Sequence, residues 1–540
     1  MTDDTSCDTD MDTDMDTDMD TDMDTDMDMS GSIPGDIEYI KTIVTEDRRL
    51  DEITSEALDS LKIFDNIFQR NGSVCRLKDK EPGKLGVENI NVPILRSIMS
   101  RCAVYRKTSM DKIIPPPDFI VKDILSQERW PFPHLTGIVS CPVLREDGSL
   151  LSNPGYDKAS GLYYNPSKGL DIPEIPDHPT KDDAIRACEL IMDNVFADFP
   201  FEDEASRANA LAGLLSPIVR SMIKGRVPMM LIDKPSAGTG ASLILEVISI
   251  IAIGRVAEMK SPSGGEDEWR KMITSALREG AALILIDNIV ARLKSPSLAR
   301  ALTSSQWSDR LLGKSELLSL PQRACWYANG NRLALSGDLP RRCYLVRMDA
   351  KLAEPWKRDP SHFTHYDIRG WVEENRGKLL AALLTMARAW VESGRPIGTG
   401  KVIGGFTEWV ETLGGILNHA GVSGFLDNLE ELYQDGDEGN EQWQRFFEIW
   451  NSIFGDRVVT AKEVVAELKK PDSDFSIEAP EEISKAMNGK KAGVVIRVGL
   501  ALKKKNKVRY RNGFMLVKGE DKSGNKKLWQ LKKIDGEAGS

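Results

Sequence analysis

The sequence predicts an α/β fold built on a parallel sheet, because apolar runs of strand length alternate with longer apolar segments of helical length. Residues 227–232 form a compact apolar run that ends at a glycine-rich loop, and residues 242–253 form an apolar segment suited to a buried helix. Residues 281–286 are a second fully apolar run, typical of a strand that is covered on both faces. Strand, loop, helix and strand in this order predict parallel strands that are joined through a helix.

The chain is long enough for several domains, since its 540 residues exceed the size at which a single hydrophobic core stops growing. Its 41% hydrophobic and 29% charged residues are ordinary for a globular protein. A triple proline at 115–117 marks one break in the pattern. We expect an acidic tail at 1–35, a mainly helical region at 36–114, a small β-rich element at 115–180, an α/β core at 181–370, a helical domain at 371–455 and a basic domain at 456–535.

The N-terminal tail carries the acidic charge of the chain. Residues 8–28 repeat Asp-Thr-Asp-Met almost without interruption, and the first 30 residues hold thirteen Asp and no Lys or Arg. The net charge of -12 therefore arises in the tail, and the rest of the chain is close to neutral. Such a segment buries too little apolar surface to offset its ordering entropy, which predicts a disordered, solvated tail. The alternative is a mimic of nucleic acid or a brake on a basic partner surface.

Cysteine pattern and hydropathy together indicate a cytoplasmic location. The seven Cys are scattered, with no CxxC pair and no His at metal spacing, which predicts neither a zinc site nor a disulfide framework. No uninterrupted apolar run approaches the ~20 residues of a membrane helix, and the N-terminus lacks a basic start and an apolar signal core. We therefore expect a cytoplasmic protein that does not enter the membrane.

The loop at 235–242, Pro-Ser-Ala-Gly-Thr-Gly-Ala-Ser, is similar to the phosphate-binding pattern G-x-x-x-x-G-K-[ST]. Gly240 stands at the second glycine and Ser242 at the hydroxyl position, whereas Pro235 replaces the first glycine and Ala241 replaces the lysine. Glycines permit the tight turn, and backbone N–H groups at a helix N-terminus attract an anion. The residues predicted to contact a nucleotide are Pro235, Gly238, Thr239, Gly240, Ala241 and Ser242.

An aspartate ends the second apolar strand, within Leu-Ile-Leu-Ile-Asp-Asn at 283–288. Asp287 stands where a magnesium-ordering carboxylate belongs, and Ser242 supplies a second oxygen ligand. An apolar strand that ends in Asp is common, but one that follows such a loop by about 45 residues is more specific. Glu266 and Glu268 are candidates to polarise water or a metal, with surface carboxylates at a helix start as the alternative. ATP and Mg²⁺ are therefore the expected ligands.

Further polar residues follow a third apolar and aromatic strand, at 329–342. Asn331 is a suitable amide for sensing a γ-phosphate or holding the attacking water. Arg341 or Arg342 would reach the nucleotide of a neighbouring subunit, and Arg310 is a further candidate for this role. The alternative for each arginine is a structural salt bridge.

From about residue 115 to residue 454 the chain resembles the phage- and integrative-element-encoded primase-helicases and replicative helicases, which are P-loop ATPases related to AAA+ and superfamily 3 ring helicases. The resemblance implies a Walker A loop at 235–242, a Walker B aspartate at Asp287, a polar sensor at Asn331, and functional arginines at Arg341 and Arg342. The segments that carry it are HLTGIVSCPVLREDGSLLSNPGYDKASGLYY, the GTG loop, EWRKMITSALREGAALILIDN, SDRLLG, NGNRLALSGDLPRR and WVEENRGKLLAALLTMARAWVESGRP.

The alanine at the lysine position leaves three hypotheses open. The site works weakly with another cation, such as Lys234 or an arginine of a neighbour. Alternatively, the chain is a nucleotide-binding or inert structural copy, or Ala241 is a deliberate inactivating substitution. Loss of the lysine removes a charge-assisted contact worth roughly 1.5–3 kcal/mol, which slows hydrolysis more certainly than it abolishes binding.

The C-terminal region is strongly basic. Residues 491–533 hold fourteen Lys or Arg against Glu520 and Asp521. Helices followed by a hairpin, with strands at 509–517 and 527–531 around a turn at 519–525, are similar to a winged-helix domain. The residues predicted to contact DNA phosphates are Lys503, Lys504, Lys505, Lys507, Arg509 and Arg511. The alternative is a solvated charged face.

We therefore expect an α/β P-loop ATPase core with a parallel sheet, helical flanks and a C-terminal winged helix. The expected protein is a homo-oligomeric ring that acts as an ATP-dependent DNA helicase or translocase on single-stranded or origin DNA of a phage or mobile element. Priming would come from a separate primase, because no zinc-binding cysteine set or polymerising carboxylates precede the core. The alternatives are a catalytically inactive ATPase-fold DNA-binding replication or regulatory protein, and an AAA+ remodeller that acts on protein.

Overall fold

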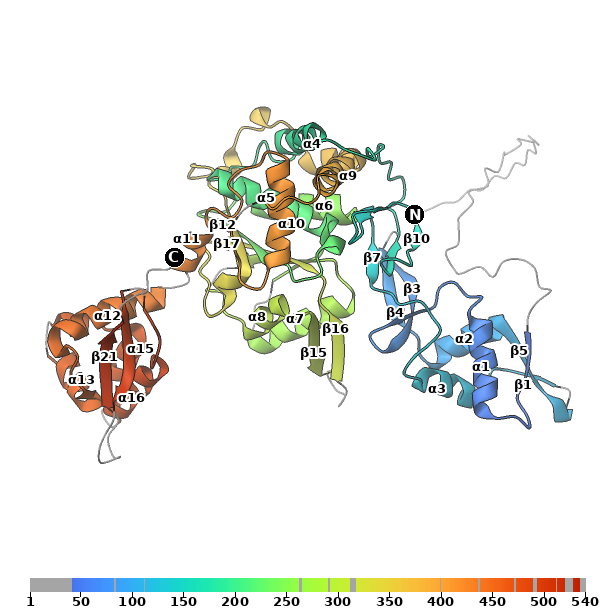
Figure 1. Cartoon of the computed structure of the whole chain (residues 1–540), viewed down its shortest axis with the longest axis horizontal. Coiled ribbons are helices and arrows are strands. Elements are labelled where there is room, and N and C mark those ends of the chain that lie inside the picture. The colour runs from blue at the N-terminus through green and yellow to red at the C-terminus, as the bar shows by residue number, and fades with distance from the viewer. Residues whose placement is uncertain are drawn as a thin grey trace, which may run out of the picture. The chain divides into compact units, whose positions relative to one another are not determined.

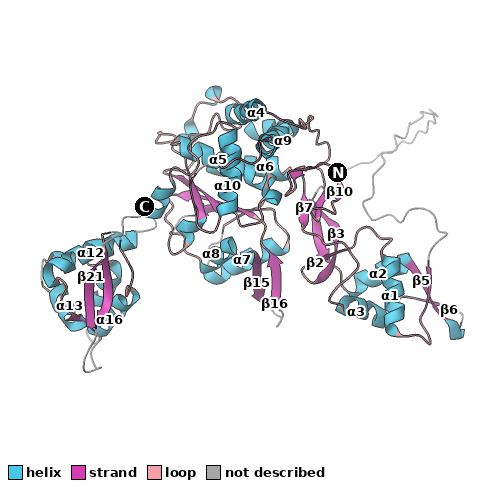
Figure 2. Ribbon diagram, in the orientation of Figure 1, coloured by secondary structure: helices cyan, strands magenta, loops and turns pink. Residues whose placement is uncertain are grey.

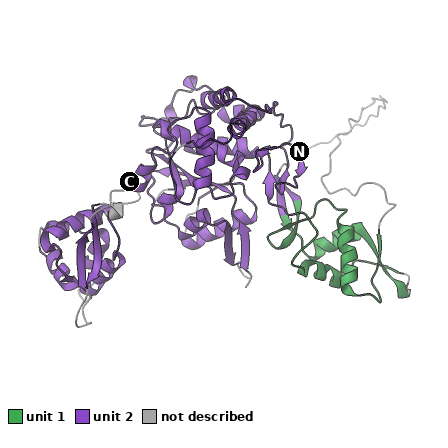
Figure 3. Cartoon of the chain, viewed as in Figure 1, with its two compact units in different colours: residues 1–77, 88–133 green, residues 78–87, 134–540 purple. Residues whose placement is uncertain are grey.

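The computed structural model describes residues 41–534, apart from 82–83, 111, 262–264, 290–291, 311–316, 399, 436–437, 471–472, 489–492, 511 and 520–527. The chain divides into two compact units, one of residues 1–77 and 88–133 and the other of residues 78–87 and 134–540 (Figure 3). The acidic repeat lies outside the described residues, so its disorder stays a prediction.

The first unit combines three helices with two small sheets. The helices α1 (Leu50–Leu61), α2 (Val92–Cys102) and α3 (Asp118–Ser126) pack around one apolar core. One sheet has the order β1 (Lys41–Val44), β5 (Ala103–Lys107) and β6 (Lys112–Ile114), with the 3-10 helix η2 (Thr108–Met110) before β6. The other has the order β2 (Phe68–Arg70), β3 (Ser73–Glu81) and β4 (Lys84–Asn89), and residues 78–87 group with the second unit. The region expected to be mainly helical therefore also contains strands.

Short strands begin the second unit, where the sequence predicted a β-rich element. One sheet contains β7 (Gly137–Val139), β10 (Gly155–Tyr156) and β11 (Leu162–Tyr164), and β8 (Val143–Leu144) pairs with β9 (Leu150–Leu151). Gly148 permits the turn between β8 and β9 because its φ of 93° is left-handed. Arg145 donates hydrogen bonds of 3.0 and 2.9 Å to Asp157 and so links the two parts of the element.

A five-stranded sheet forms the centre of the second unit (Figures 1 and 2). Its strands are β12 (Met229–Lys234), β13 (Met259–Lys260), β14 (Leu283–Ile289), β17 (Cys325–Asn331) and β18 (Cys343–Arg347). They lie in the order β13-β14-β17-β12-β18, and every pairing is parallel. This confirms the predicted parallel sheet. Since all five strands run the same way, their carboxyl ends meet at one edge.

Helices cover both faces of this sheet, and alternate residues of β12 face the two cores. Met230 and Ile232 share a core with α4 (Lys181–Asn194), α5 (Glu204–Ile218), α6 (Ala241–Ile253), α9 (Ile368–Glu392) and α10 (Thr407–His419). Met229 and Leu231 share the other core with α7 (Glu266–Arg278) and α8 (Pro296–Thr303). Burial on both faces explains the continuous apolar runs of the sequence. α9 and α10, from the region expected to form a helical domain, share the first of these cores with the sheet.

Arg376 of α9 holds the C-terminal end of α6. Arg376 is 5% exposed, and its Nε donates to the carbonyl oxygens of Ile250 and Ile251 at 2.9 and 3.0 Å. Its Nη1 and Nη2 donate to Ser167 Oγ and to the Ser140 carbonyl, each at 3.2 Å. Burial lowers the pKa of Arg376, but the partial negative charge at the end of a helix favours a cation there. These bonds tie α6 to α9.

Several short elements complete the central part of the second unit. They are β15 (Gln306–Arg310), β16 (Leu317–Pro321), α11 (Leu429–Asp435) and the 3-10 helices η3 (Arg220–Met222), η4 (Leu339–Arg342), η5 (Pro355–Lys357) and η6 (Pro360–His362). β15 and β16 form an antiparallel hairpin outside the five-stranded sheet. Within the described ranges, no helix has the length and apolar character needed to span a bilayer.

The C-terminal residues 438–533 have an apolar core of their own, rich in aromatic side chains such as Trp443, Phe446 and Trp450. Its helices are α12 (Glu438–Phe454), α13 (Ala461–Leu468), α14 (Asp474–Ile477), α15 (Glu481–Asn488) and α16 (Val494–Lys504). β19 (Val459–Thr460), β20 (Phe514–Gly519) and β21 (Leu528–Lys533) form an antiparallel sheet in the order β19-β21-β20. The first strand of the pair starts later than predicted, because a turn bonded from Gly513 N–H to the Tyr510 carbonyl precedes it. Most of the expected turn at 519–525 lies outside the described residues.

Candidate functional site

The glycine loop connects β12 to α6 at the carboxyl edge of the five-stranded sheet. Gly238 and Gly240 have φ values of 81° and 97°, a left-handed conformation that costs glycine little. Gly240 immediately precedes α6, and no side chain caps this helix start. The first N–H groups of a helix lack partners within it and carry partial positive charge. The loop therefore presents backbone donors at the edge of the sheet where the strands end.

Three polar side chains meet beside the loop. Ser242 Oγ, in the first turn of α6, donates a hydrogen bond of 2.8 Å to Asp287 Oδ1, in the last part of β14. The Asn329 amide donates to the same Asp287 oxygen at 2.6 Å and to Ser242 Oγ at 3.3 Å. Asn329 is on β17, which lies between β12 and β14 in the sheet. The strand order thus brings these residues together.

Asn329 also holds the backbone that follows Asp287. Its Oδ1 accepts a hydrogen bond of 3.0 Å from the N–H of Asn288, whose φ is 57°, an uncommon value for a residue other than glycine. The register between β14 and β17 is irregular at this point, between Ile286 and Ile289. Asn329 is fully buried, and the sequence prediction missed it. The signal available was a polar residue inside an apolar strand, because buried amides normally have partners.

Asn331, the predicted sensor, is two residues further along β17. It is exposed and lies opposite Lys234 in the register between β17 and β12. Lys234 is half-buried; burial lowers the pKa of its ammonium group, while the carboxylate of Asp287 opposes this shift. The charge of Lys234 therefore acts on the same carboxylate that Ser242 and Asn329 bind.

The residue at the lysine position faces the core rather than the loop opening. Ala241 is 1% exposed and packs in the same apolar core as Ile244 and Leu245 of α6. Pro235 at the other end of the loop is exposed. Thr239 is 2% exposed, and its hydroxyl oxygen has no hydrogen-bond partner among the residues that the structure describes.

The predicted arginines occupy different environments. Arg342 donates to the Ala299 carbonyl, to Thr303 Oγ1 at 2.8 Å and to Asp338 at 3.3 Å. The first two contacts join the guanidinium of Arg342 to the end of α8, and the third is an ion pair with Asp338. Arg341, in the same 3-10 helix η4, is exposed. Arg310 is also exposed and ends β15, in the separate hairpin.

The two glutamates proposed for water or metal activation have local partners. Glu266 accepts a hydrogen bond from the N–H of Ser297, at the start of α8. Glu268 binds Lys271 at 2.7 Å, one turn along α7. Both observations match the alternative of carboxylates at a helix start.

The predicted DNA-binding residues follow from α16 into the segment before β20. Lys503, Lys504, Lys507 and Arg509 are exposed. Lys505 is different, because its ammonium group lies 5.2 Å from the centre of the Trp443 ring and 3.5 Å from Glu482. It therefore contributes to packing within the C-terminal residues. Arg511, a further predicted contact, lies outside the described residues.

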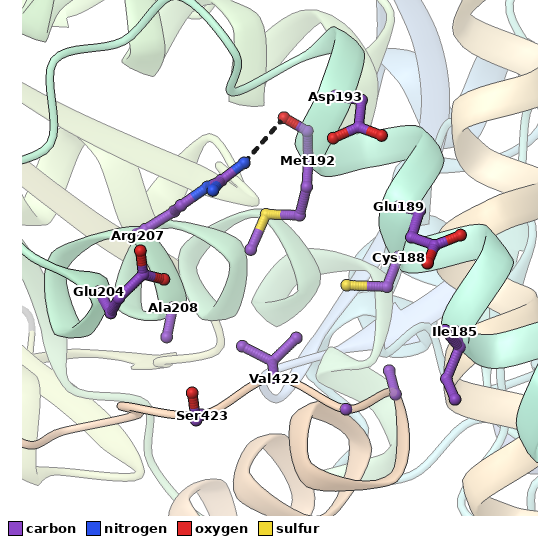
Figure 4. Close-up of a pocket in the computed structure, with 12 residues that line it drawn as sticks. Ile185, Cys188, Glu189, Met192, Asp193, Glu204, Arg207, Ala208, Val422 and Ser423 are labelled. Atoms are coloured by element: carbon purple, nitrogen blue, oxygen red, sulfur yellow. Dashed lines mark hydrogen bonds between the residues drawn. The ribbon is translucent and has the colours of Figure 1, made fainter.

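A pocket of about 320 Å³ lies between α4, α5 and residues 420–423, and none of the residues that line it belongs to the loop 235–242 (Figure 4). Glu189, Asp193 and Glu204 line it together with Arg207, which donates to the Met192 carbonyl at 3.3 Å. The pocket was not expected from the sequence. Its mixed charges do not single out one class of ligand.

Fold and site together define a mixed α/β protein whose polar cluster lies at the carboxyl edge of a parallel sheet. No family model matches the chain, and no curated protein matches it. Among solved structures, the A-form apo structure of the NrS-1 C terminal region, CTR(305–718), is similar with a TM-score of 0.35 and 13% identity, over 85% of this chain and 96% of that chain. A similarity of this size is too low to define the fold or the function.

Proposed function

We propose that the second unit binds a magnesium–nucleoside triphosphate at the loop 235–242, and that the chain uses it to move along or open DNA. The observation that supports the nucleotide site is the hydrogen bond of 2.8 Å between Ser242 and Asp287. This bond joins the Ser242 hydroxyl, at the start of α6, to the Asp287 carboxylate. Both groups lie beside the loop, which offers backbone N–H donors. Mg²⁺ prefers such oxygen ligands, together with phosphate and water oxygens.

The residues of the site fit both groups of the ligand. Mg²⁺ keeps several waters and needs one or two carboxylates, so Ser242 and Asp287 suffice as protein ligands. The described residues contain no cluster of three or more His, Cys, Asp or Glu that could form an all-protein metal site. For the phosphates, the loop offers backbone N–H groups and the buried hydroxyl of Thr239, which a phosphate oxygen would satisfy.

Each residue has a distinct role in the proposed site. Mg²⁺ would neutralise charge that develops on the phosphates during transfer. Asn329 orients the Asp287 carboxylate through its bond of 2.6 Å. Asn331, which is exposed at the end of β17, would hold a water. Arg341, which is exposed, is a better candidate than Arg342 to act on the nucleotide of a neighbouring subunit in a ring.

The DNA part of the proposal rests on the basic C-terminal residues and on the sequence resemblance to ring helicases. Lys503, Lys504, Lys507 and Arg509 are exposed in a short stretch, where they would meet the phosphates of a nucleic acid. Helices followed by an antiparallel strand pair also agree with the proposed winged helix. Such contacts give affinity that falls with salt and carries little sequence preference.

The decisive experiment measures ATP binding and ATP turnover by the full chain, with and without Mg²⁺ and single-stranded DNA. We expect Mg²⁺-dependent binding and turnover that DNA stimulates. If ATP does not bind in Mg²⁺, the proposal is wrong.

A second candidate function is a DNA-binding protein that keeps the site without turnover. The observation in its favour is Ala241, whose side chain lies in the core, so that no cation reaches the phosphates from this position. A lysine introduced there would have to leave the core, so Ala241→Lys is not a clean test. Lys234→Met is a sharper test of whether another lysine supplies the missing cation. Lys260→Met, at the end of β13, is its control. ATP binding without turnover in the unmodified chain would favour this second function.

A further inference from the structure

Two aromatic side chains lie directly against the glycine loop. A Cβ on Gly238 would stand 3.0 Å from both the backbone nitrogen and the Cβ of Trp356, and 3.2 Å from its ring. A Cβ on Gly240 would stand 3.4 Å from the ring of Phe199. The glycines therefore let two other segments approach the loop closely. Trp356, in the 3-10 helix η5, nevertheless remains 59% exposed.

The segments that carry these two rings are bonded to each other. Arg358 donates a hydrogen bond of 2.8 Å to the carbonyl oxygen of Asp198, the residue before Phe199. The carboxylate of Asp198 accepts from the N–H and the hydroxyl of Thr364, at 2.8 and 3.1 Å. The Phe199 ring also contacts those of Phe196 and Phe201, with ring centres 6.4 and 6.3 Å apart. The segments that carry the two rings are thus joined by bonds outside the loop, and the Phe199 ring is also packed against two other rings.

We propose that Trp356, with Phe199 beside the same loop, binds the base of the nucleotide whose phosphates the loop holds. This inference rests on the proposed nucleotide site and names its ligand as a nucleoside triphosphate rather than a bare polyphosphate. An indole that is mostly exposed leaves apolar surface in water, and a nucleobase is a flat partner that covers it. Stacking of a base on an aromatic side chain is sequence-tolerant, because every base has a π-face.

The position of Trp356 supports this ligand over a protein partner. Trp356 lies directly beside the loop, since its backbone nitrogen and its ring are both next to Gly238. A base attached to phosphates at the loop is therefore brought to the indole by the same binding event. Tyr366, on the same stretch of chain, is even more exposed at 81% but is ten residues further on, and the atoms nearest to Gly238 and Gly240 belong to other residues.

The test compares the affinity of the full chain for Mg²⁺-ATP and for Mg²⁺-tripolyphosphate by calorimetry. Trp356→Ala should weaken ATP binding by about tenfold or more, the range that loss of one base–aromatic stack gives. Binding of tripolyphosphate should change by less than about twofold, because this ligand has no base. Trp356→Phe should retain most of the ATP affinity, and Tyr366→Ala, the matched exposed aromatic, should bind as the unmodified chain does.

Other results would overturn the inference, and each has a different meaning. Equal losses for ATP and tripolyphosphate in Trp356→Ala would mean that the indole supports the loop and does not bind a base. Unchanged ATP affinity in Trp356→Ala would mean that the indole does not bind the base. If the unmodified chain binds tripolyphosphate no less tightly than ATP, the base contact is absent although the phosphate site exists. If it binds neither ligand, the nucleotide site itself is wrong.

Discussion

The hydroxyl of Ser242 and the carboxylate of Asp287 form a hydrogen bond of 2.8 Å although 45 positions separate them in the sequence. Ser242 follows β12 and Asp287 lies in the last part of β14, and these two strands are not neighbours because β17 lies between them. A parallel sheet makes this contact possible because the carboxyl ends of all its strands lie at one edge. The middle strand supplies Asn329, which binds both residues.

Removing either oxygen ligand should abolish the metal dependence of ATP binding. In Ser242→Ala and Asp287→Asn, Mg²⁺ should no longer increase ATP affinity, because the protein ligands for the ion are lost or uncharged. Titration calorimetry with and without Mg²⁺ measures this difference. Ser249→Ala is the control, since the hydroxyl of this buried serine of α6 donates within its own helix, to the Leu245 carbonyl at 2.8 Å. A Mg²⁺ effect that survives both substitutions would exclude these residues as ligands.

Asn329→Leu should destabilise the protein, and Asn331→Ala should not. The first substitution leaves the N–H of Asn288 and the carboxylate of Asp287 without their buried partner, at a cost of about 2–4 kcal/mol. Asn331 is on the same strand but exposed, so its loss should change stability by less than about 0.5 kcal/mol. Urea unfolding of the two variants gives the comparison. Equal stability would mean that the Asn329 bonds do not form.

Arg376→Met should also destabilise the second unit, by about 3 kcal/mol, because buried carbonyl groups at the end of α6 lose their donor. Arg388→Met is the matched control on the same helix. Its guanidinium binds Asp177 at 2.9 Å, and the Asp177 side chain is 86% exposed, so that water can take over this partner when the guanidinium is removed. Thermal unfolding should show a clear decrease for the first variant only; a similar decrease in both would point to a general sensitivity of α9.

The pair Arg145 and Asp157 should make stability depend on pH. Hydrogen bonds from Arg145, and then from Ser160, hold the pKa of the Asp157 carboxyl well below its usual range. A depressed pKa stabilises the folded state above the unfolded value of about 3.9, and this contribution is lost as pH falls through the folded value. Asp157→Asn should therefore be equally destabilising at pH 7 and pH 5, and its effect should shrink as pH falls below about 4. Urea unfolding at about pH 7, 5, 3 and 2 checks this, with Asp177→Asn as control.

The exposed lysines at the end of α16 should set the salt dependence of DNA binding. Replacement of Lys503 and Lys504 by Ser removes two cations, which should lower the slope of log affinity against log salt by roughly 1.4 for single-stranded DNA. Fluorescence anisotropy over a range of salt concentrations measures the slope. Lys485→Ser is the control, because Lys485 is paired with Glu481. An unchanged slope in the double variant would remove these residues from the DNA interface.

Part of the site was within reach of sequence analysis because it depends on local pattern. The loop glycines have left-handed φ values that the pattern of small residues indicates. Asp287 follows a continuous apolar run, which predicts the end of a buried strand. The position of Asn329 inside an apolar run was a local signal, but its bonds to Asp287 and Ser242 could not be predicted, because they depend on the order of the strands. The same holds for Arg342, whose partners Ala299 and Thr303 are on another helix.

The sequence by itself determined which segments are strands and helices in the central sheet, because apolar periodicity decides which faces must leave water. It also determined the chemistry offered at the loop and at Asp287. Only the tertiary structure decided the strand order, the hydrogen bonds of Asn329, the core position of Ala241 and the approach of Trp356 to Gly238. These features arise from contacts between distant parts of the chain, and the packing of the whole unit selects them.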